Sequence, residues 1–487
     1  MSPYLVLGIV LAYFFVLIGI SWLTSRKADT QAFFTANRKS PWYLVAFGMV
    51  GATLSGVTFI SVPGEVGNSA FSYLQFVLGN VVGYWLVAGI LLPLYYRLNL
   101  VSIYSFLDQR FGARAYKTGS FFFLISKLIG AAFRLFLVAG VLQIAFFDAF
   151  DIPFSLTVIV TIALIWVYTF KGGIKTIVWT DTIQTLFLVS AVIFTIVAIS
   201  KSLDLDLKGL VNVISNDEHS RVFFWDWRSG DHFLKQFFAG MFITIVMVGM
   251  DQDMMQKNLT CKNKKEAQKN MLVFSFSFLV TVILFLSLGV MLYIFAIQNG
   301  IAIPVNSDDL YPTLAIQYFG LPVGIAFLLG ITAAAYSSAD SALTALTTSF
   351  SVDFLNIDKY EESKRLNIKK WSHLTFSVLL IIVILVFQAI NNQSIVKSVF
   401  IAAGYTYGPI LGLFVFGLYS KRKVKDKWVP VVAVSAPIIC YLISKNSELL
   451  FNGYKFGFEL LILNGLITFM GLFTISKKIG NNTNDSK

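Results

Sequence analysis

Charged residues are scarce in this chain: they make up 13% of its 487 residues, about half of the share found in soluble globular proteins. Cysteine and histidine are scarcer still, with two and three copies. Cys261 lies in a basic loop and Cys440 in an apolar segment, so a disulfide between them is implausible. The three histidines are scattered and give no basis for a metal centre or a catalytic triad.

Apolar residues dominate instead, at 56% of the chain. Many uncharged runs reach the ~20 residues that a helix needs to cross a bilayer. Thirteen candidate spans are 4–23, 42–62, 72–96, 118–147, 153–170, 175–200, 233–256, 271–297, 322–353, 371–389, 396–419, 428–444 and 456–476. The sequence therefore predicts an all-α polytopic membrane protein. The first span lacks a basic region before it, so we interpret it as a retained helix rather than a cleaved signal peptide.

The formal net charge of +12 could suggest a nucleic-acid partner, but its distribution argues against one. Basic residues concentrate in alternate loops, such as "KNLTCKNKKEAQK", "KYEESKRLNIKK" and "KRKVKDK", while the intervening "PGEVGNSAF", "DAFDIP" and "NGIAIPVNSDDLYPT" contain no Lys or Arg. The positive-inside rule places the basic loops in the cytoplasm. We therefore expect the N-terminus outside and the C-terminus inside, in the cell membrane.

Only four ionisable residues lie deep within these spans: Lys127, Arg134, Asp181 and Asp340. Such groups are costly in a bilayer and usually have a partner or a function. For each, the alternative is a side chain that snorkels to water from a helix end. That alternative is strongest for Asp181, which is two turns from Lys175, and weakest for Asp340.

The surroundings of Asp340 sharpen its interpretation. In "AAAYSSADSALTAL", Ser337, Asp340 and Ser341 are three and four residues apart and share one helix face, with Ser338 slightly rotated from it. Carboxylate, hydroxyl and carbonyl oxygens suit alkali or alkaline-earth cations. Close helix packing would explain the small serines equally well, but it does not explain the aspartate.

The span 42–62 contains "FGMVGATLSGVTFISVPGE", whose glycines weaken a helix interior. Unwinding would release carbonyls, which is tolerated at membrane depth only where they line a cavity or bind something. Broken helices of this kind are typical of transporters built from inverted repeats. The span 233–256 also carries Gly240 and Gly249, and we interpret it as the start of a second repeat.

Four segments together resemble the sodium:solute symporter family, which includes bacterial proline, sialic acid and sodium-galactose carriers. They are "GATLSGVTFISVPGEV", "PLYYRLNLVSIYSFLDQRFG", "GGIKTIVWTDTIQT" and "AAAYSSADSALTALTTSFSVDF". The resemblance implies a LeuT-type core of two inverted five-helix repeats, alternating access and sodium-driven uptake. It divides the chain into a first helix and loop (1–41), a first repeat (42–200), an extracellular loop (201–232), a second repeat (233–419), and two peripheral helices with a tail (420–487).

The resemblance also implies sodium ligands. The family's common site maps onto the carbonyls of Gly51, Leu54 and Ala334 and the hydroxyls of Ser337 and Ser338. Because a carbonyl ligand tolerates alanine, Gly51→Ala is expected to be mild unless the methyl group obstructs the local conformation.

Some family members hold a second sodium, and the matching residues here are Asp181, Ser337, Asp340 and Ser341. Relatives with two sodium ions have serine at the position of Asp340. The extra carboxylate would strengthen cation binding or carry a proton. It could instead form a salt bridge with Lys127 or Arg134.

The family implies a solute cavity near the membrane midplane. The candidate lining residues are Thr53, Ser55, Thr58, Gln75, Asn80, Arg134 and Thr244. Arg134 could pair with a carboxylate. The expected solute is a small polar organic molecule such as a sugar, a sialic acid, an amino acid or a carboxylate.

Two other function classes compete with sodium symport. Proton coupling could use Asp181 and Asp340 as a relay, and a sensor could be built on the same scaffold. An intramembrane enzyme has no supporting motif. The expected partners are one or two sodium ions, the solute and the lipid bilayer, with neither nucleic acid nor an obligatory protein partner.

Overall fold

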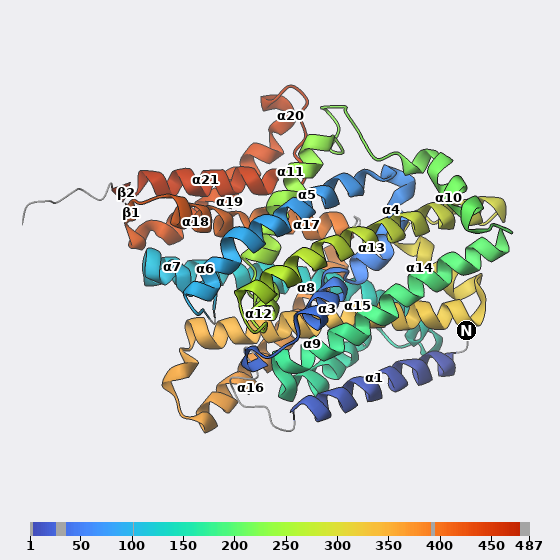
Figure 1. Ribbon diagram of the computed structural model, residues 1–487, viewed down its shortest axis with the longest axis horizontal. Helices are drawn as coiled ribbons and strands as arrows, with labels where there is room; N and C mark the ends of the chain where they lie inside the picture. Colours follow the sequence, from blue (N-terminus) through green and yellow to red (C-terminus); the bar gives the residue numbers. More distant parts are fainter. Residues whose placement is uncertain (1–2, 26–35, 101, 391–394, 478–487) are drawn as a thin grey trace, which may run out of the picture.

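The computed structural model describes residues 3–25, 36–100, 102–390 and 395–477, and helices make up nearly all of it (Figure 1). The helices of the first half are α1 (Pro3–Ser25), α3 (Trp42–Thr53), α4 (Gly56–Ser69), α5 (Ser72–Leu86), α6 (Leu92–Arg97), α7 (Ser105–Arg110), α8 (Ala113–Ala145), α9 (Phe154–Ser202) and α10 (Leu207–Asn216). Those of the second half are α11 (Phe233–Thr244), α12 (Gln252–Asn258), α13 (Lys264–Gln298), α14 (Leu310–Gln317), α15 (Gly320–Ser349), α16 (Glu362–Ile390), α17 (Ile395–Thr406), α18 (Gly408–Tyr419), α19 (Val429–Lys445), α20 (Ser447–Leu450) and α21 (Leu460–Thr474).

Short 3-10 and π segments extend or connect these helices. They are η1 (Ala36–Arg38), η2 (Val87–Leu91), η3 (Phe147–Phe150), η4 (Glu218–Ser220), η5 (Ile245–Gly249), η6 (Ser307–Asp309), η7 (Phe350–Phe354), η8 (Ile357–Lys359) and η9 (Asp426–Trp428). Two short strands, β1 (Lys423–Val424) and β2 (Ser476–Lys477), pair antiparallel.

Within the described residues, eight helices are long and apolar enough to cross a membrane, and three bent pairs raise that number to 11. Two shorter apolar helices, Phe154–Val167 and Leu460–Thr474, coincide with further predicted spans. Each predicted segment therefore contains an apolar helix. The segments 153–170 and 175–200 differ from expectation in one respect, because both lie within the single helix α9.

The first bent pair is the helix break predicted from the glycines of the second span. α3 ends at Thr53 and α4 begins at Gly56, with a bend of 53° between the flanking helices. Leu54 and Ser55 form the break. The last carbonyls of α3 lose their intrahelical partners there, which is the arrangement that a bound cation requires.

The second bent pair joins α11 and η5 to α12 with a bend of 69°. Its break falls at Met250 and Asp251, beyond the two glycines on which the prediction rested. A third bend of 44° separates α17 from α18 at Tyr407. The two broken helices each open one predicted half of the chain. The division into inverted repeats stays a prediction.

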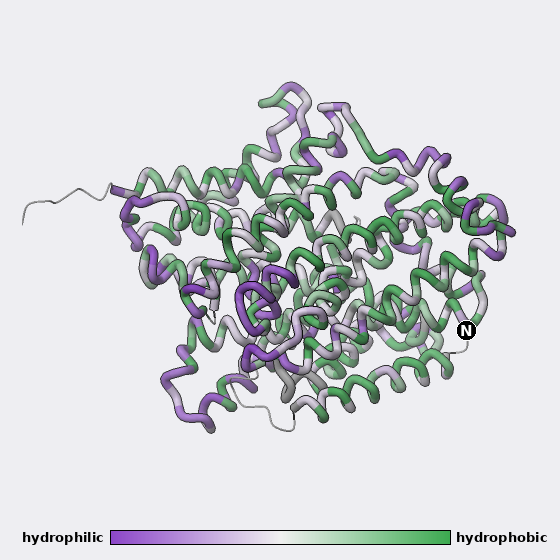
Figure 2. Tube along the Cα trace, viewed as in Figure 1, coloured by the Kyte–Doolittle hydropathy of each residue, from purple (hydrophilic) through white to green (hydrophobic). Residues whose placement is uncertain are grey.

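The long helices run along the horizontal axis of Figure 1, and α9 and α15 lie next to each other against α1. The N-terminal end of α1 lies at one end of the molecule and β2 at the other. Hydrophilic segments collect at both ends, around α7 and β2 and around α10 (Figure 2). Residues 26–35 of the predicted first loop and the tail 478–487 lie outside the described residues.

Candidate ion and solute sites

Three helices converge at the candidate sodium site. The N–H of Gly51 on α3 donates to Thr185 Oγ1 on α9 at 3.0 Å. One turn earlier on α9, Asp181 Oδ1 accepts a hydrogen bond from Ser337 Oγ of α15 at 2.6 Å. Asp181 also lies beneath Gly48 of α3, since a Cβ on Gly48 would be 3.1 Å from the Cβ of Asp181. The break in α3–α4 thus lies close to the serines of α15 through shared contacts with α9.

The five residues predicted to form the common sodium site are all buried. They are Gly51, Leu54, Ala334, Ser337 and Ser338. The hydroxyl of Ser338 has no hydrogen-bond partner among the described residues. A buried hydroxyl without a partner is costly, and a cation ligand removes that cost. The donor set of carbonyls and hydroxyls therefore fits sodium.

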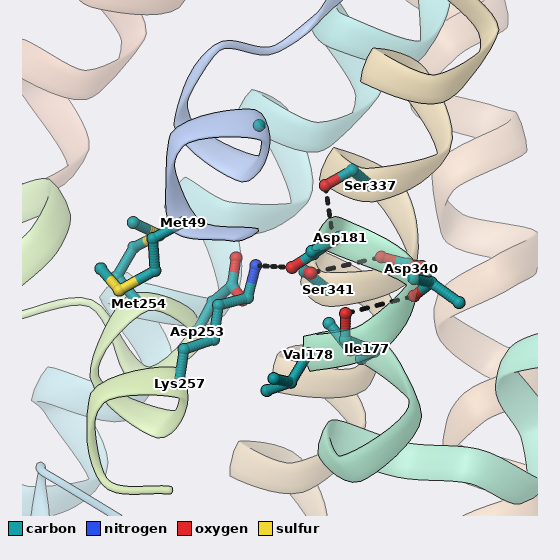
Figure 3. Close-up of polar contacts among 12 residues, drawn as sticks. Met49, Ile177, Val178, Asp181, Asp253, Met254, Lys257, Ser337, Asp340 and Ser341 are labelled. Atoms are coloured by element: carbon teal, nitrogen blue, oxygen red, sulfur yellow. Dashed lines mark hydrogen bonds and ion pairs between the residues drawn. The ribbon is translucent and has the colours of Figure 1, made fainter. Parts of the chain in front are cut away.

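The second predicted site is compact and more charged (Figure 3). Ser341 Oγ donates to Asp340 Oδ1 at 3.2 Å, and both side chains are buried. Ser337 lies one turn earlier on α15 and is bonded to Asp181 of α9. The structure thus brings together all four residues that the resemblance implied for a second sodium.

Lys127 does not pair with Asp340, which was one of the sequence-based alternatives. Its ammonium lies 2.6 Å from Asp253 Oδ2 and 3.4 Å from Asp251 Oδ1. Asp251 is in turn bonded by Tyr407, whose hydroxyl donates to Oδ2 at 2.7 Å. The second and third helix breaks are therefore linked through one carboxylate.

The sequence predicts that Lys257 begins a cytoplasmic basic loop, but the structure places it in α12 with a buried side chain. Its Nζ lies 2.8 Å from Asp181 Oδ2 and 4.0 Å from Asp253 Oδ1, and its side chain is only 2% exposed. The chain bends by 69° before α12, and all seven residues of this helix are buried. Hydropathy alone marked this segment as a span end, where a charge is unremarkable.

A sequence signal for this cluster was nevertheless available. In "DQDMMQK", Asp253 and Lys257 are four residues apart and share one helix face. Asp251 precedes the helix and accepts hydrogen bonds from the N–H groups of Asp253 and Met254 at 2.9 and 3.3 Å. A capping aspartate indicates a new helix start, so the sequence does carry a local signal for this cluster.

A central cavity lies beside the first break. Six of the seven predicted solute residues line it: Thr53, Ser55, Thr58, Asn80, Arg134 and Thr244. Lys127, Asp251, Asp253 and Tyr407 also line it, so the charged network faces the same space. The hydroxyl of Thr53 has no hydrogen-bond partner among the described residues, which leaves it available to a solute.

Gln75, the seventh predicted solute residue, lies outside this cavity. Its amide donates to the carbonyl of Asp231 at 2.9 Å, and its oxygen accepts from the N–H of Phe224 at 3.1 Å. Both partners belong to the long loop before α11. Gln75 therefore anchors that loop, because its hydrogen-bonding groups are used by the backbone.

Comparison with known proteins identifies the family. The profile of the sodium:solute symporter family matches residues 33–426. The chain is 26% identical to the sodium/sialic acid symporter NanT of Aliivibrio fischeri, covering 92% of this chain and 89% of that protein. It is 25% identical to the sodium/sialic acid symporter SiaT of Proteus mirabilis, covering 95% and 94%.

Solved structures show the same fold. A sodium-coupled sialic acid symporter in a substrate-bound outward-open state superposes with a TM-score of 0.78 at 19% identity, over 97% of this chain and 99% of that one. The nucleobase-cation symporter Mhp1 follows with a TM-score of 0.56 at 13% identity, over 92% and 95%. The fold is the LeuT-type arrangement expected from the sequence. By profile and by fold, this multi-pass membrane protein belongs to the sodium:solute symporter family.

Proposed function

We propose that this symporter imports a small organic acid together with sodium, and that the sodium ion binds between the break of α3–α4 and Ser337 and Ser338 of α15. One observation carries the ion site: the buried Ser338 hydroxyl lacks a partner among the described residues and belongs to the helix that contacts α3 through Asp181. The carbonyls of Gly51, Leu54 and Ala334 would complete the coordination. These ligands are neutral, so none of them has to lose a proton before it binds a cation.

The chemistry of the cavity supports an acidic solute. Arg134 lines it, and no ion pair satisfies this guanidinium among the residues that the structure describes. Guanidinium groups recognise carboxylates with two parallel hydrogen bonds. The hydroxyls of Thr53, Ser55 and Thr58 line the same space and suit a solute that also carries hydroxyl or amide groups. Two relatives transport sialic acid, which combines these features.

Alternating access places this cavity in contact with each side of the membrane in turn. We propose the orientation predicted by the basic loops, with the N-terminus outside and the cytoplasmic loops at the end that contains β1, β2 and α7. Arg110 of α7 donates to the carbonyl of Arg422 at 3.1 Å, so α7 contacts the basic loop that follows α18. The protein would then bring the solute into the cell.

The decisive experiment is uptake by proteoliposomes under an imposed sodium or proton gradient. The panel contains sialic acid, a neutral sugar, a zwitterionic amino acid and a simple carboxylate. We expect a sodium gradient to drive uptake of an acid and Arg134→Gln to abolish it, with the expression level unchanged. Uptake driven by protons alone would overturn sodium coupling. Equal uptake of a neutral sugar by both proteins would overturn the role of Arg134.

A further inference from the structure

We propose that Lys257 and sodium compete for Asp181, and that Asp253 receives the Lys257 ammonium group when sodium binds. This inference rests on the proposed sodium function and extends it to a residue on α12. In the structure, Lys257 is a positioning residue: it holds Asp181 from one side, while Ser337 holds it from the other (Figure 3).

Both oxygens of the Asp181 carboxylate are already used. Oδ1 accepts the hydroxyl of Ser337 at 2.6 Å, and Oδ2 faces the ammonium of Lys257 at 2.8 Å. A sodium ion bound to this carboxylate would lie within a few ångströms of the ammonium group. Like charges at that distance repel strongly when both are shielded from water. Sodium can therefore use Asp181 fully only when Lys257 withdraws.

The structure offers Lys257 a second acceptor. Asp253 lies one turn earlier on α12, and its Oδ1 is 4.0 Å from Lys257 Nζ. Figure 3 shows the Asp253 carboxylate beside the ammonium group. A rotation of the side chain closes that distance without moving α12. The charge then stays paired, which matters because an unpaired buried charge is strongly destabilising.

The charges of this region favour such an exchange. Four buried carboxylates, Asp181, Asp251, Asp253 and Asp340, surround two buried ammonium groups, Lys127 and Lys257. The four carboxylates outnumber the two ammonium groups and the guanidinium of Arg134 by one. An added cation would reduce that imbalance.

The exchange would also connect the ion site with the solute cavity. Asp253 already binds Lys127 at 2.6 Å, and Lys127 has Asp251 as its other partner at 3.4 Å. All three line the cavity. The arrival of Lys257 at Asp253 would shift Lys127 toward Asp251. Binding of sodium would thus change the charges that face the solute.

The test measures sodium binding in purified protein by its effect on the melting temperature, with KCl replacing NaCl to keep ionic strength constant. Lys257→Met removes the competing charge while keeping a similar length. We expect the half-saturating sodium concentration to fall about tenfold or more. Lys264→Met, an exposed position on α13, is the control and should match the wild type. In Asp181→Asn/Lys257→Met, the gain should disappear.

A second variant acts in the opposite direction. Asp253→Asn removes the alternative acceptor, so Lys257 stays on Asp181 and the half-saturating sodium concentration should rise. Lys127 keeps Asp251 as a partner in this variant. A folded Lys257→Met protein with unchanged or weaker sodium binding overturns the competition. If Lys257→Met does not fold, an Asp253→Asn protein that binds sodium as the wild type does overturns it. If the wild type shows no sodium effect at all, the proposed function itself fails.

Discussion

The two broken helices differ in which groups satisfy the backbone at the break. The first break, at Leu54 and Ser55, contains no charged residue, and Ser55 makes no side-chain cap to α4. The second break is stabilised from within: Asp251 caps α12 and also binds Lys127 and Tyr407. A break that leaves carbonyls and hydroxyls open can take up an ion. A break whose polar groups are already bonded to its own side chains is stabilised without a bound ion.

The largest loss of stability should come from removing the carboxylate at the second break. Asp251→Ala removes the cap of α12 and the partner of Tyr407 and Lys127, and we expect a loss of about 3–5 kcal/mol in unfolding free energy. Ser55→Ala removes no cap and should lower the unfolding free energy by less than Asp251→Ala does. Thermal unfolding of both variants in detergent tests the contrast. Equal losses would show that the two breaks are held in the same way.

The next effect concerns the ion at the first break. Ser337→Ala and Ser338→Ala each remove a hydroxyl ligand, while a hydrogen bond to a charged group is worth about 1.5–3 kcal/mol. We therefore expect the half-saturating sodium concentration for uptake to rise roughly tenfold to a hundredfold. Ser435→Ala on α19, whose hydroxyl bonds only locally to Val432, serves as the control. Unchanged sodium dependence in both ligand variants would refute the common site.

Variants of Asp340 test whether the protein transports one sodium ion or two with each solute molecule. If Asp340 and Asp181 share a second ion, Asp340→Asn and Asp181→Asn should each lower the sodium-to-solute ratio by one. The double variant should be little worse than either, because the residues serve one site. Reversal-potential measurements in proteoliposomes report the ratio. An unchanged ratio in both single variants would exclude the shared second ion.

A smaller loss of stability is expected for Gly51→Ala. The sequence suggested that Gly51→Ala is mild, but the structure places the new Cβ 3.1 Å from the Cα of Thr185 and closer still to its hydroxyl. Overpacking of this kind costs about 1–3 kcal/mol, and the shift would also disturb the neighbouring carbonyl ligand. Thr185→Ala in the same chain should restore part of the stability. A wild-type melting temperature for Gly51→Ala would show that α3 can move away from α9.

The smallest change tests whether the two broken helices are inverted. Asn68 lies near the end of α4, and Lys264 begins α13 after the second broken helix. Cysteines at these positions should be labelled from opposite sides of the membrane, with Asn68→Cys labelled from outside. Labelling of both from the same side would refute the inverted arrangement and the thirteen-span topology.

The native Cys261 should add little background to that experiment. It is fully buried, and burial raises the pKa of its thiol to about 12. The reactive thiolate is therefore scarce at the neutral pH of a maleimide reaction. Two further positions extend the test: Lys423→Cys should react from the cytoplasm and Asn299→Cys from outside.

The sequence predicted the helices and the first break, because hydropathy and glycine content are local signals. The grouping of Asp181 with the serines of α15 came from the resemblance to the family, and the structure shows Asp181 bonded to one of them, Ser337. The roles of Gln75 and Lys257 were not predictable in this way. Gln75 bonds Asp231 and Phe224, which lie 156 and 149 residues further along the chain. Lys257 is buried on the short helix that follows the 69° bend. Local periodicity predicts neither the long-range partners of a side chain nor the direction of the chain after a helix break.

The close contact between α5 and α11 has a mechanical consequence. A Cβ on Gly79 would lie 2.8 Å from the carbonyl carbon of Phe237, and one on Gly240 would lie 2.9 Å from that of Phe76. The two backbones therefore touch at reciprocal positions, and Gln75 ties the same pair through the loop before α11. Because their backbones are in contact, α5 and α11 are expected to move together as one rigid unit. A rotation of α11 would therefore carry α5 with it, so a movement at the cavity would also reach the loop before α11.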